Sequence, residues 1–284
     1  MDDDVEGDTM GSRHWICGLC LGCFLFARAG EAQWRDPKLI AGQVGFNIAI
    51  SFVGKMVVHH ESPKRAFKQA LKEGTVSGLM AHGGYSIAAQ NPNLALVGKA
   101  LAQKSSLTTR RSIQGQPVFD ESLYTHWELT HSFVHFKWDG SPHLALDAIN
   151  AAFSAYYVLS SPDQYTFDTK RTLTSGSLVF LNRDPAPGVR GYYVPGVIWI
   201  DATRDDAQWV LSHEIVHSLQ AERGSAMKEW HHENIRFNWL VFASGVPAML
   251  AGWPAHDTRW HEIEANNYAG VGVADRANEV RVTP

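Results

Sequence analysis

Two histidines four residues apart, with a glutamate directly after the first, limit the fold of this chain more than any other feature. His213, Glu214 and His217 lie within the run SHEIVHSLQ. On an α-helix, residues i and i+4 project from the same face, so both imidazoles can bind one tetrahedral metal ion. Glu214 projects from the neighbouring part of the surface, where its carboxylate can reach a water at the open coordination position. The spacing therefore predicts a metal-binding helix with zinc as its ion.

The residues around this motif favour the helix that the motif requires. Val210-Leu211 before it and Leu219 after it continue an apolar helix face. Thr203 and Asp206 resemble a capping box at the start of the helix, and Gly224 is expected to end it. The alternative interpretation is an amphipathic helix whose histidines face solvent or make ordinary hydrogen bonds.

A catalytic zinc site needs a third protein ligand, which must come from another part of the chain. The candidates that follow the helix are His231, His232, Glu233, His256, His261, Glu262 and Glu264. The segment WHEIEANNYA, residues 260–269, is the most suggestive of these regions because it brings three of the candidates onto one predicted helix.

The pair of segments resembles the gluzincin pattern, in which HExxH on one helix is completed by the Glu of an E-x-x-[AS]-D segment on another. The similarity is closest to short-core gluzincins, which include membrane peptidases of the CaaX type, and SHEIVHSLQ resembles the HELxHxxQ helices of uncharacterised bacterial zincin-like proteins. It covers residues 199–270. The resemblance implies that Glu262 is the third zinc ligand, with Glu264 next and His261 after it. Asn266 stands where the family has an Asp that supports a zinc-binding His, and it lacks that residue's charge.

What the resemblance implies for function is a zinc metallopeptidase, with Glu214 as the general base that takes a proton from zinc-activated water. Tyr268 or His256 would donate a hydrogen bond to the developing oxyanion. The partner would be a peptide or protein substrate. Two alternatives stay open: a non-catalytic zincin-fold envelope or interaction protein that binds zinc, and a zinc hydrolase that does not act on peptides.

The remaining sequence predicts an α+β fold. Residues 38–60 read as a buried or interfacial helix, and helical periodicity continues over residues 63–103 with breaks at Gly83-Gly84 and Asn91-Pro92. After a break at residues 108–117, the chain reads as β-rich. We expect two strands within residues 165–181, around Ser175-Gly176, and a buried strand over residues 192–200 with a bulge or edge at Pro195-Gly196. A further apolar stretch covers residues 238–253.

These segments suggest three regions. Residues 118–284 would form a zincin-like domain with a small mixed or antiparallel sheet behind the HExxH helix. Residues 33–117 would form a helical region, either a separate subdomain or a membrane-contacting region. Residues 1–32 resemble a signal peptide behind an acidic leader, because an uncharged apolar run follows Arg13-His14 and small residues follow the run. A membrane anchor is the alternative.

The same apolar run holds all three cysteines, Cys17, Cys20 and Cys23. Its lack of charge favours a targeting segment over a metal cluster, so we expect an exported protein that is periplasmic, secreted or membrane-associated. The net charge of −4, with dispersed basic residues, argues against a nucleic-acid partner. Oligomeric state cannot be predicted from this sequence.

Overall fold

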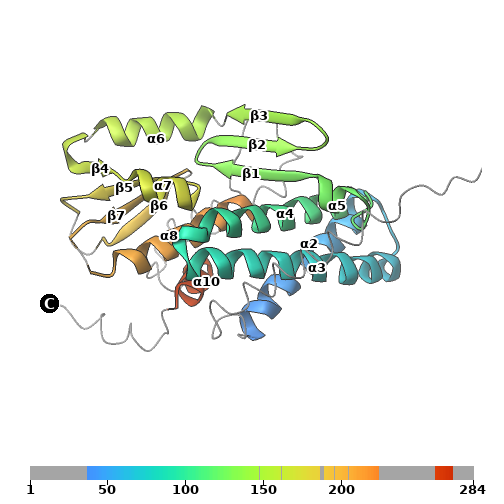
Figure 1. The fold of residues 1–284 in the computed structure, drawn as a ribbon. Coiled ribbons are helices and arrows are strands. Elements are labelled where there is room, and N and C mark those ends of the chain that lie inside the picture. The colour runs from blue at the N-terminus through green and yellow to red at the C-terminus, as the bar shows by residue number, and fades with distance from the viewer. Residues whose placement is uncertain are drawn as a thin grey trace, which may run out of the picture.

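The fold is α+β, with long helices and two small sheets, in a computed structural model of the chain (Figure 1). The structure describes residues 37–146, 148–160, 162–185, 189–194, 196–203, 205–223 and 260–270. The predicted signal peptide with its cysteines, the apolar stretch 238–253, and His231, His232, Glu233 and His256 lie outside the described residues.

Three helices near the N-terminus pack lengthwise against one another. They are α2 (Pro37–Val58), α3 (Pro63–Gln90) and α4 (Ala95–Ile113), with the 3₁₀ turn η1 (Pro92–Leu94) between the last two. The predicted break at Asn91-Pro92 is confirmed: the Asn91 side chain accepts a hydrogen bond from the Asn93 backbone N–H and caps the 3₁₀ turn.

The predicted break at Gly83-Gly84 is wrong, since α3 runs through both glycines. Gly84 instead allows α3 and α4 to approach closely, because a Cβ there would lie 2.5 Å from the backbone oxygen of Gly98. Helix α4 also continues to Ile113, beyond the start of the break predicted at residue 108.

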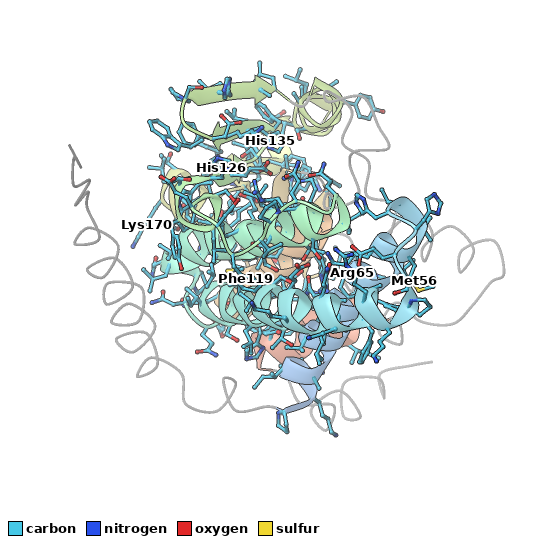
Figure 2. The ribbon with its side chains drawn as sticks, turned by 90° about the vertical axis from the view of Figure 1, so that its right-hand side faces the viewer. Met56, Arg65, Phe119, His126, His135 and Lys170 are labelled. Atoms are coloured by element: carbon cyan, nitrogen blue, oxygen red, sulfur yellow. The ribbon has the colours of Figure 1, made fainter. Side chains whose placement is uncertain are left out.

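The first sheet lies along α4 and is antiparallel. Following the short helix α5 (Ser122–Thr125), its strands are β1 (Trp127–His131), β2 (Val134–Trp138) and β3 (Pro142–Leu146), in that order. Arg110 of α4 pairs with Glu128 of β1 at 2.6 Å, and the Gln103 side chain accepts from the Thr130 backbone N–H at 2.8 Å. Figure 2 shows this sheet, with His135 labelled, above the helical layer.

The second sheet is mixed, in the order β4-β5-β7-β6, with β5 and β7 parallel. Helix α6 (Ala148–Ser160) and the turn η2 (Pro162–Gln164) lead into β4 (Tyr165–Phe167); α7 (Thr169–Ser175), β5 (Leu178–Asn182), β6 (Gly191–Val194) and β7 (Val197–Asp201) follow. The mixed sheet agrees with the predicted class.

The two strands predicted within residues 165–181 are present as β4 and β5, but the segment between them differs from the prediction, and the single strand predicted over residues 192–200 is wrong. Within residues 165–181 the strands are separated by helix α7, because the Asp168 side chain accepts from the Arg171 backbone N–H at 2.9 Å and caps a helix there. Residues 192–200 contain a hairpin rather than one bulged strand: β6 and β7 pair antiparallel, and Gly196 takes a positive φ of 87° at the turn.

Helix α8 (Ala207–Arg223) lies between the second sheet and the N-terminal helices, and α10 (Trp260–Ala269) packs against it (Figure 1). The alternation of β7 explains this placement. Ile198 and Ile200 join the core that contains α8, while Val197 and Trp199 pack with Phe180 on the opposite face of the sheet.

One hydrophobic core crosses the boundary predicted at residues 117 and 118. Leu39 and Tyr85 of the N-terminal helices belong to the same cluster of buried residues as Ile215 and Leu219 of α8 and Ala265 of α10. The helices of residues 37–113 therefore share buried apolar residues with α8 and α10. They form one side of the body that holds α8.

Candidate metal centre

Helix α8 presents its polar residues to the protein interior. It begins at Ala207, four residues after the predicted cap, because Thr203 is engaged elsewhere: its hydroxyl and backbone N–H both donate to the Asp201 carboxylate, at 2.6 and 2.8 Å. The helix is described as far as Arg223, and Gly224, where its end is predicted, lies outside the described residues. Along it, His213 and Glu214 are both buried, which is costly unless their polar atoms find partners.

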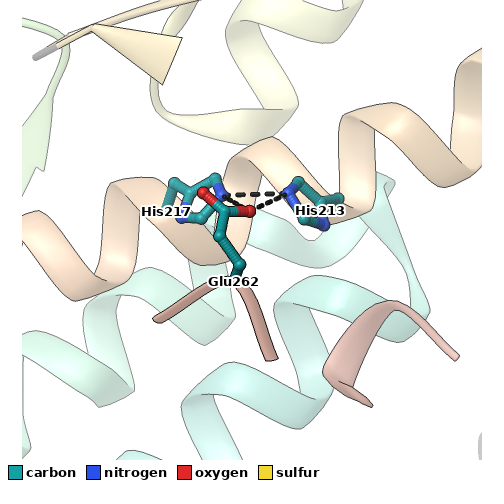
Figure 3. Close-up of side chains that lie close together, drawn as sticks. All are labelled: His213, His217 and Glu262. Atoms are coloured by element: carbon teal, nitrogen blue, oxygen red, sulfur yellow. Dashed lines mark hydrogen bonds and ion pairs between the residues drawn. The ribbon is translucent and has the colours of Figure 1, made fainter. Parts of the chain in front are cut away.

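His213, His217 and Glu262 converge on one point, as Figure 3 shows. The Nε2 atoms of the two histidines lie 2.9 Å apart, and each lies 3.2 Å from the Glu262 Oε2. The histidines stand one turn apart on α8, and Glu262 reaches them from the first turn of α10. This buried His-His-Glu group could hold a metal ion.

The hydrogen bond of Gln220 sets which nitrogen of His217 faces the group. Gln220 lies one turn after His217, and its Oε1 accepts from the His217 Nδ1 at 2.8 Å. With the proton on Nδ1, the lone pair of Nε2 points at His213 and Glu262, which is the form in which an imidazole binds a metal. Gln220 therefore acts on the orientation and tautomer of the His217 ring.

Without a metal ion, a proton takes the place of the cation. Burial alone would lower the pKa of His217, but the hydrogen bond with Glu262 and the negative charges of Glu214 and Glu262 outweigh it and raise the pKa to about 9. Two imidazole nitrogens at 2.9 Å cannot both present lone pairs to each other, so at least one of the two Nε2 atoms carries a proton.

Glu264 is engaged by other residues and does not join the group. Arg223 donates to both of its oxygens at 2.8 and 2.9 Å, and Gln220 and Gln43 donate to it at 2.8 and 2.9 Å. Four hydrogen bonds use the acceptor positions that a metal would need. Between the two carboxylates that the sequence left open, the geometry selects Glu262.

His261 lies beside the group rather than within it. Its Nε2 is 3.4 Å from the Glu262 Oε1, and its ring centroid is 5.9 Å from that of His217. It is buried, so it contributes to the wall around Glu262.

The Glu214 carboxylate faces the edge strand β6. A Cβ on Gly191 would lie 3.3 Å from the Glu214 Oε1, and it would also overlap the side chain of Val210 and approach the backbone oxygen of Trp199 at 2.9 Å. Strand β6 thus lies directly on α8 at this point. Glycine at position 191 makes that approach sterically feasible.

The structure does not bring Tyr268 to the group. Its side chain is fully buried, its hydroxyl lies 2.9 Å from the His82 Nδ1, and its ring packs against Tyr85. Burial raises the pKa of Tyr268 well above its ordinary value. These contacts place Tyr268 in the core between α3 and α10, where it supports the helix that carries Glu262.

Asn266 does not contact a histidine of the group among the described residues. Its Nδ2 donates to the backbone oxygen of Glu262 at 2.7 Å, one turn earlier on the same helix. The role that the resemblance implied, support of a metal-binding His, is carried by Gln220 for His217.

Sequence reasoning assigned no role to Gln220, Arg223 or Gly191. Gln220 and Arg223 follow His217 at intervals of three residues, and this spacing places them on neighbouring parts of the helix surface. The three-residue spacing from His217 could have pointed to Gln220, since the pattern HELxHxxQ has a Gln at the same position. No local signal marks Gly191, whose importance comes from the packing of β6 on α8.

No protein-family model, no curated protein and no solved structure matches this chain.

Proposed function

We propose that this protein is a zinc-dependent metallopeptidase of the zincin type, with His213, His217 and Glu262 as the zinc ligands. The observation that carries the proposal is the convergence of the two Nε2 atoms and the Glu262 Oε2. These three atoms lie within 3.2 Å of one another, close enough to bind one metal ion. Two histidines and one glutamate are a donor set of catalytic zinc sites that keep a fourth position open.

The separations of the donor atoms suit zinc. Ligand atoms about 2.05 Å from a tetrahedral zinc ion lie about 3.3 Å from one another. The observed separations of 2.9, 3.2 and 3.2 Å are within a few tenths of this value. The Nδ1 of buried His213 has no hydrogen-bond partner among the described residues, so the polar contacts of this ring with those residues are the contacts of Nε2 with His217 and Glu262.

The chemistry divides between the ion and the chain. Zinc, when bound, lowers the pKa of water towards about 7 and polarises a carbonyl. Glu214 accepts the proton of the attacking water and returns it to the leaving amine. Its carboxylate suits this work because it sits next to the ligand His213 in the chain, close enough for its charge to raise the pKa of His217, yet it belongs to none of the ligand contacts in the triad.

Strand β6 supports a peptide as the substrate. It is the last strand in the order β4-β5-β7-β6, so among the described strands only one of its edges is paired. An extended peptide can add to such an edge through backbone hydrogen bonds. The edge runs past Gly191, next to the Glu214 carboxylate, so a peptide bound there would pass the proposed general base.

The test combines metal content with hydrolysis. Purified protein is expected to hold one zinc per chain and to cleave casein. Glu214→Gln should keep the zinc and lose cleavage by at least a thousandfold, because it removes the base and leaves the three ligands in place. His213→Ala should lose the zinc.

Two other outcomes would replace the proposal. Stoichiometric zinc without turnover of casein or a peptide library would support a non-catalytic zinc-binding protein. Turnover of an ester or amide substrate that is not a peptide, lost in Glu214→Gln, would support a different zinc hydrolase.

A further inference from the structure

Helix α2 buries polar residues and exposes apolar ones, which reverses the usual pattern of a helix on a water-soluble protein. Its buried residues are Leu39, Gln43, Asn47, Ser51 and Lys55. They meet partners inside the protein: Thr109 of α4 donates to the Asn47 Oδ1 at 2.7 Å, and Lys55 pairs with Glu73 of α3 at 3.0 Å. The outward face from Ile40 to Gly54 carries no charge.

The exposed side of α2 continues onto α3 as one apolar patch. Val53 and Val57 of α2 are 55% and 58% exposed, and Phe67 and Leu71 of α3 are 53% and 48% exposed. The ring of Phe52 packs edge-on against Phe67, with 6.1 Å between centroids, and so joins the two helices. We call these five residues the α2/α3 patch. Patches of exposed large apolar side chains mark interaction surfaces.

Basic residues surround this patch. Lys64 and Lys68 lie on the same helix face as Phe67 and Leu71, at spacings of three and four residues, and neither has an ion pair among the described residues. Next to this face, α3 borders a cavity of 570 Å³ whose lining includes Lys55, Arg65, Lys68 and Lys72, with Glu73 as its one carboxylate. Figure 2 shows Arg65 and Met56 at this end of the molecule.

We propose that the α2/α3 patch docks on an anionic phospholipid surface, with α2 lying in the membrane interface and Lys64, Arg65, Lys68 and Lys72 contacting phosphate groups. Apolar insertion combined with basic residues at headgroup depth is the physical basis of binding by interfacial helices. This inference is independent of the proposed zinc chemistry, because no residue of the patch touches the metal centre.

The position of the charges favours lying in the interface over crossing the bilayer. Within the described residues, α2 is long and apolar enough to cross a membrane by length and composition. Gly74 of α3 lies against Ile48 and Gly78 against Val44, so Lys72 and Lys68 lie level with the second half of α2. If α2 crossed the bilayer, these ammonium groups would enter hydrocarbon, where each costs several kcal/mol.

The same charges favour a lipid surface over a second copy of the chain. Two copies joined patch to patch would bring two sets of lysines together, with like charges in contact. Anionic headgroups complement those lysines.

The test is flotation of the full chain with phosphatidylcholine vesicles, with and without phosphatidylglycerol. We expect binding to the anionic vesicles that weakens as salt is raised. The double variant Lys64→Glu, Lys68→Glu should bind at least about 25-fold more weakly, because each Lys near an anionic surface contributes about fivefold in affinity and each introduced Glu adds repulsion. Lys170→Glu, an exposed charge reversal on the distant helix α7 (Figure 2), should bind like the unaltered chain.

A second pair of variants tests the apolar part. Val53→Asp with Val57→Asp should abolish flotation, while Leu144→Asp, at a residue 74% exposed on β3, should not. Equal binding by the patch variants and their controls would overturn the proposal. So would equal binding to neutral and anionic vesicles. A dimer in solution that Val53→Asp with Val57→Asp disrupts, without flotation of the unaltered chain, would show that a second copy occupies the patch instead.

Discussion

Helices α2 and α8 both bury polar side chains, but they use them differently. In α8, His213 and His217 turn their nitrogens towards one point and towards Glu262. In α2, Asn47 and Lys55 are each paired with a separate partner on a neighbouring helix. Convergent polar atoms need a cation, whereas dispersed pairs need nothing further. The difference shows that the geometry of buried polar groups, more than their number, identifies a site.

The largest effect is expected from a change at Glu262 of α10, which contacts both histidines of α8. Glu262→Gln should weaken zinc binding more than a hundredfold, which is beyond the loss typical of residues that only support ligands. Competition with a chromophoric zinc chelator measures the affinity, and circular dichroism checks that the fold is kept. Loss of zinc in Glu264→Gln with retention in Glu262→Gln would reverse the assignment of the two carboxylates.

Glu264→Gln should act on stability rather than directly on the metal. The change leaves Arg223 buried beside an uncharged partner, and breaking a buried pair costs about 3 kcal/mol. Urea unfolding of the metal-free protein measures the loss. Replacing both residues by Met should recover part of it, because no unpaired charge then remains. A loss no larger than that of an exposed ion pair would contradict the network described for α8 and α10.

The dependence of zinc binding on pH tests whether the convergent polar groups of α8 hold a proton that zinc displaces. In the metal-free protein His217, with its pKa of about 9, holds a proton that zinc must displace. Zinc affinity should therefore rise about tenfold per pH unit from about pH 6.5 to about 9 and level off above it. Isothermal titration in several buffers measures both affinity and proton release. Affinity that does not change over this range would mean that no proton occupies the group.

The same pKa predicts the stability of the metal-free protein. The folded-state pKa is raised above the ordinary value of 6.5, so the stabilisation is complete below about pH 6.5 and is lost as the pH rises through about 9. Thermal unfolding after removal of metal should show a falling Tm over this interval.

The smallest effect is expected on α2. Asn47→Ala removes hydrogen bonds to Gln43 and Thr109 and should lower the free energy of unfolding by about 1 kcal/mol. Zinc affinity should stay unchanged, because Asn47 touches no residue of the metal centre. Val53→Ala, on the exposed face of the same helix, is the matched control and should change stability by less than about 0.5 kcal/mol. A change in zinc affinity would show that α2 and α8 are coupled.

The sequence predicted the two α8 histidines well because their geometry is local: a spacing of four residues fixes their positions on any helix. The resemblance ranked Glu262 ahead of Glu264, but the spacing of the residues alone could not choose between them, since both lie on the same short helix. That choice depends on Arg223, Gln220 and Gln43, which reach Glu264 from two other helices. The packing of these helices therefore distinguishes Glu262 from Glu264.

The features of the fold also divide into those that local sequence signals predict and those that depend on other parts of the chain. The α+β class and the break at Asn91-Pro92 follow from local signals, and both are confirmed. The hairpin at Gly196 and helix α7 were missed, because an apolar run can be read as one strand and because the Asp168 cap was overlooked. The shared core of Leu39 and Ile215 could not be seen from composition, since it joins residues far apart in the chain.

The separation between His217 and Glu262 has a consequence for the order of events during synthesis. Glu262 follows His217 by 45 residues, which a ribosome adds in about 2 to 9 s at ordinary rates. During that interval the nascent chain holds both imidazoles but lacks the carboxylate that completes the triad. Under the proposed function, a zinc ion captured early would bind only two side chains, so tight loading of the ion would wait until α10 has been made and has docked.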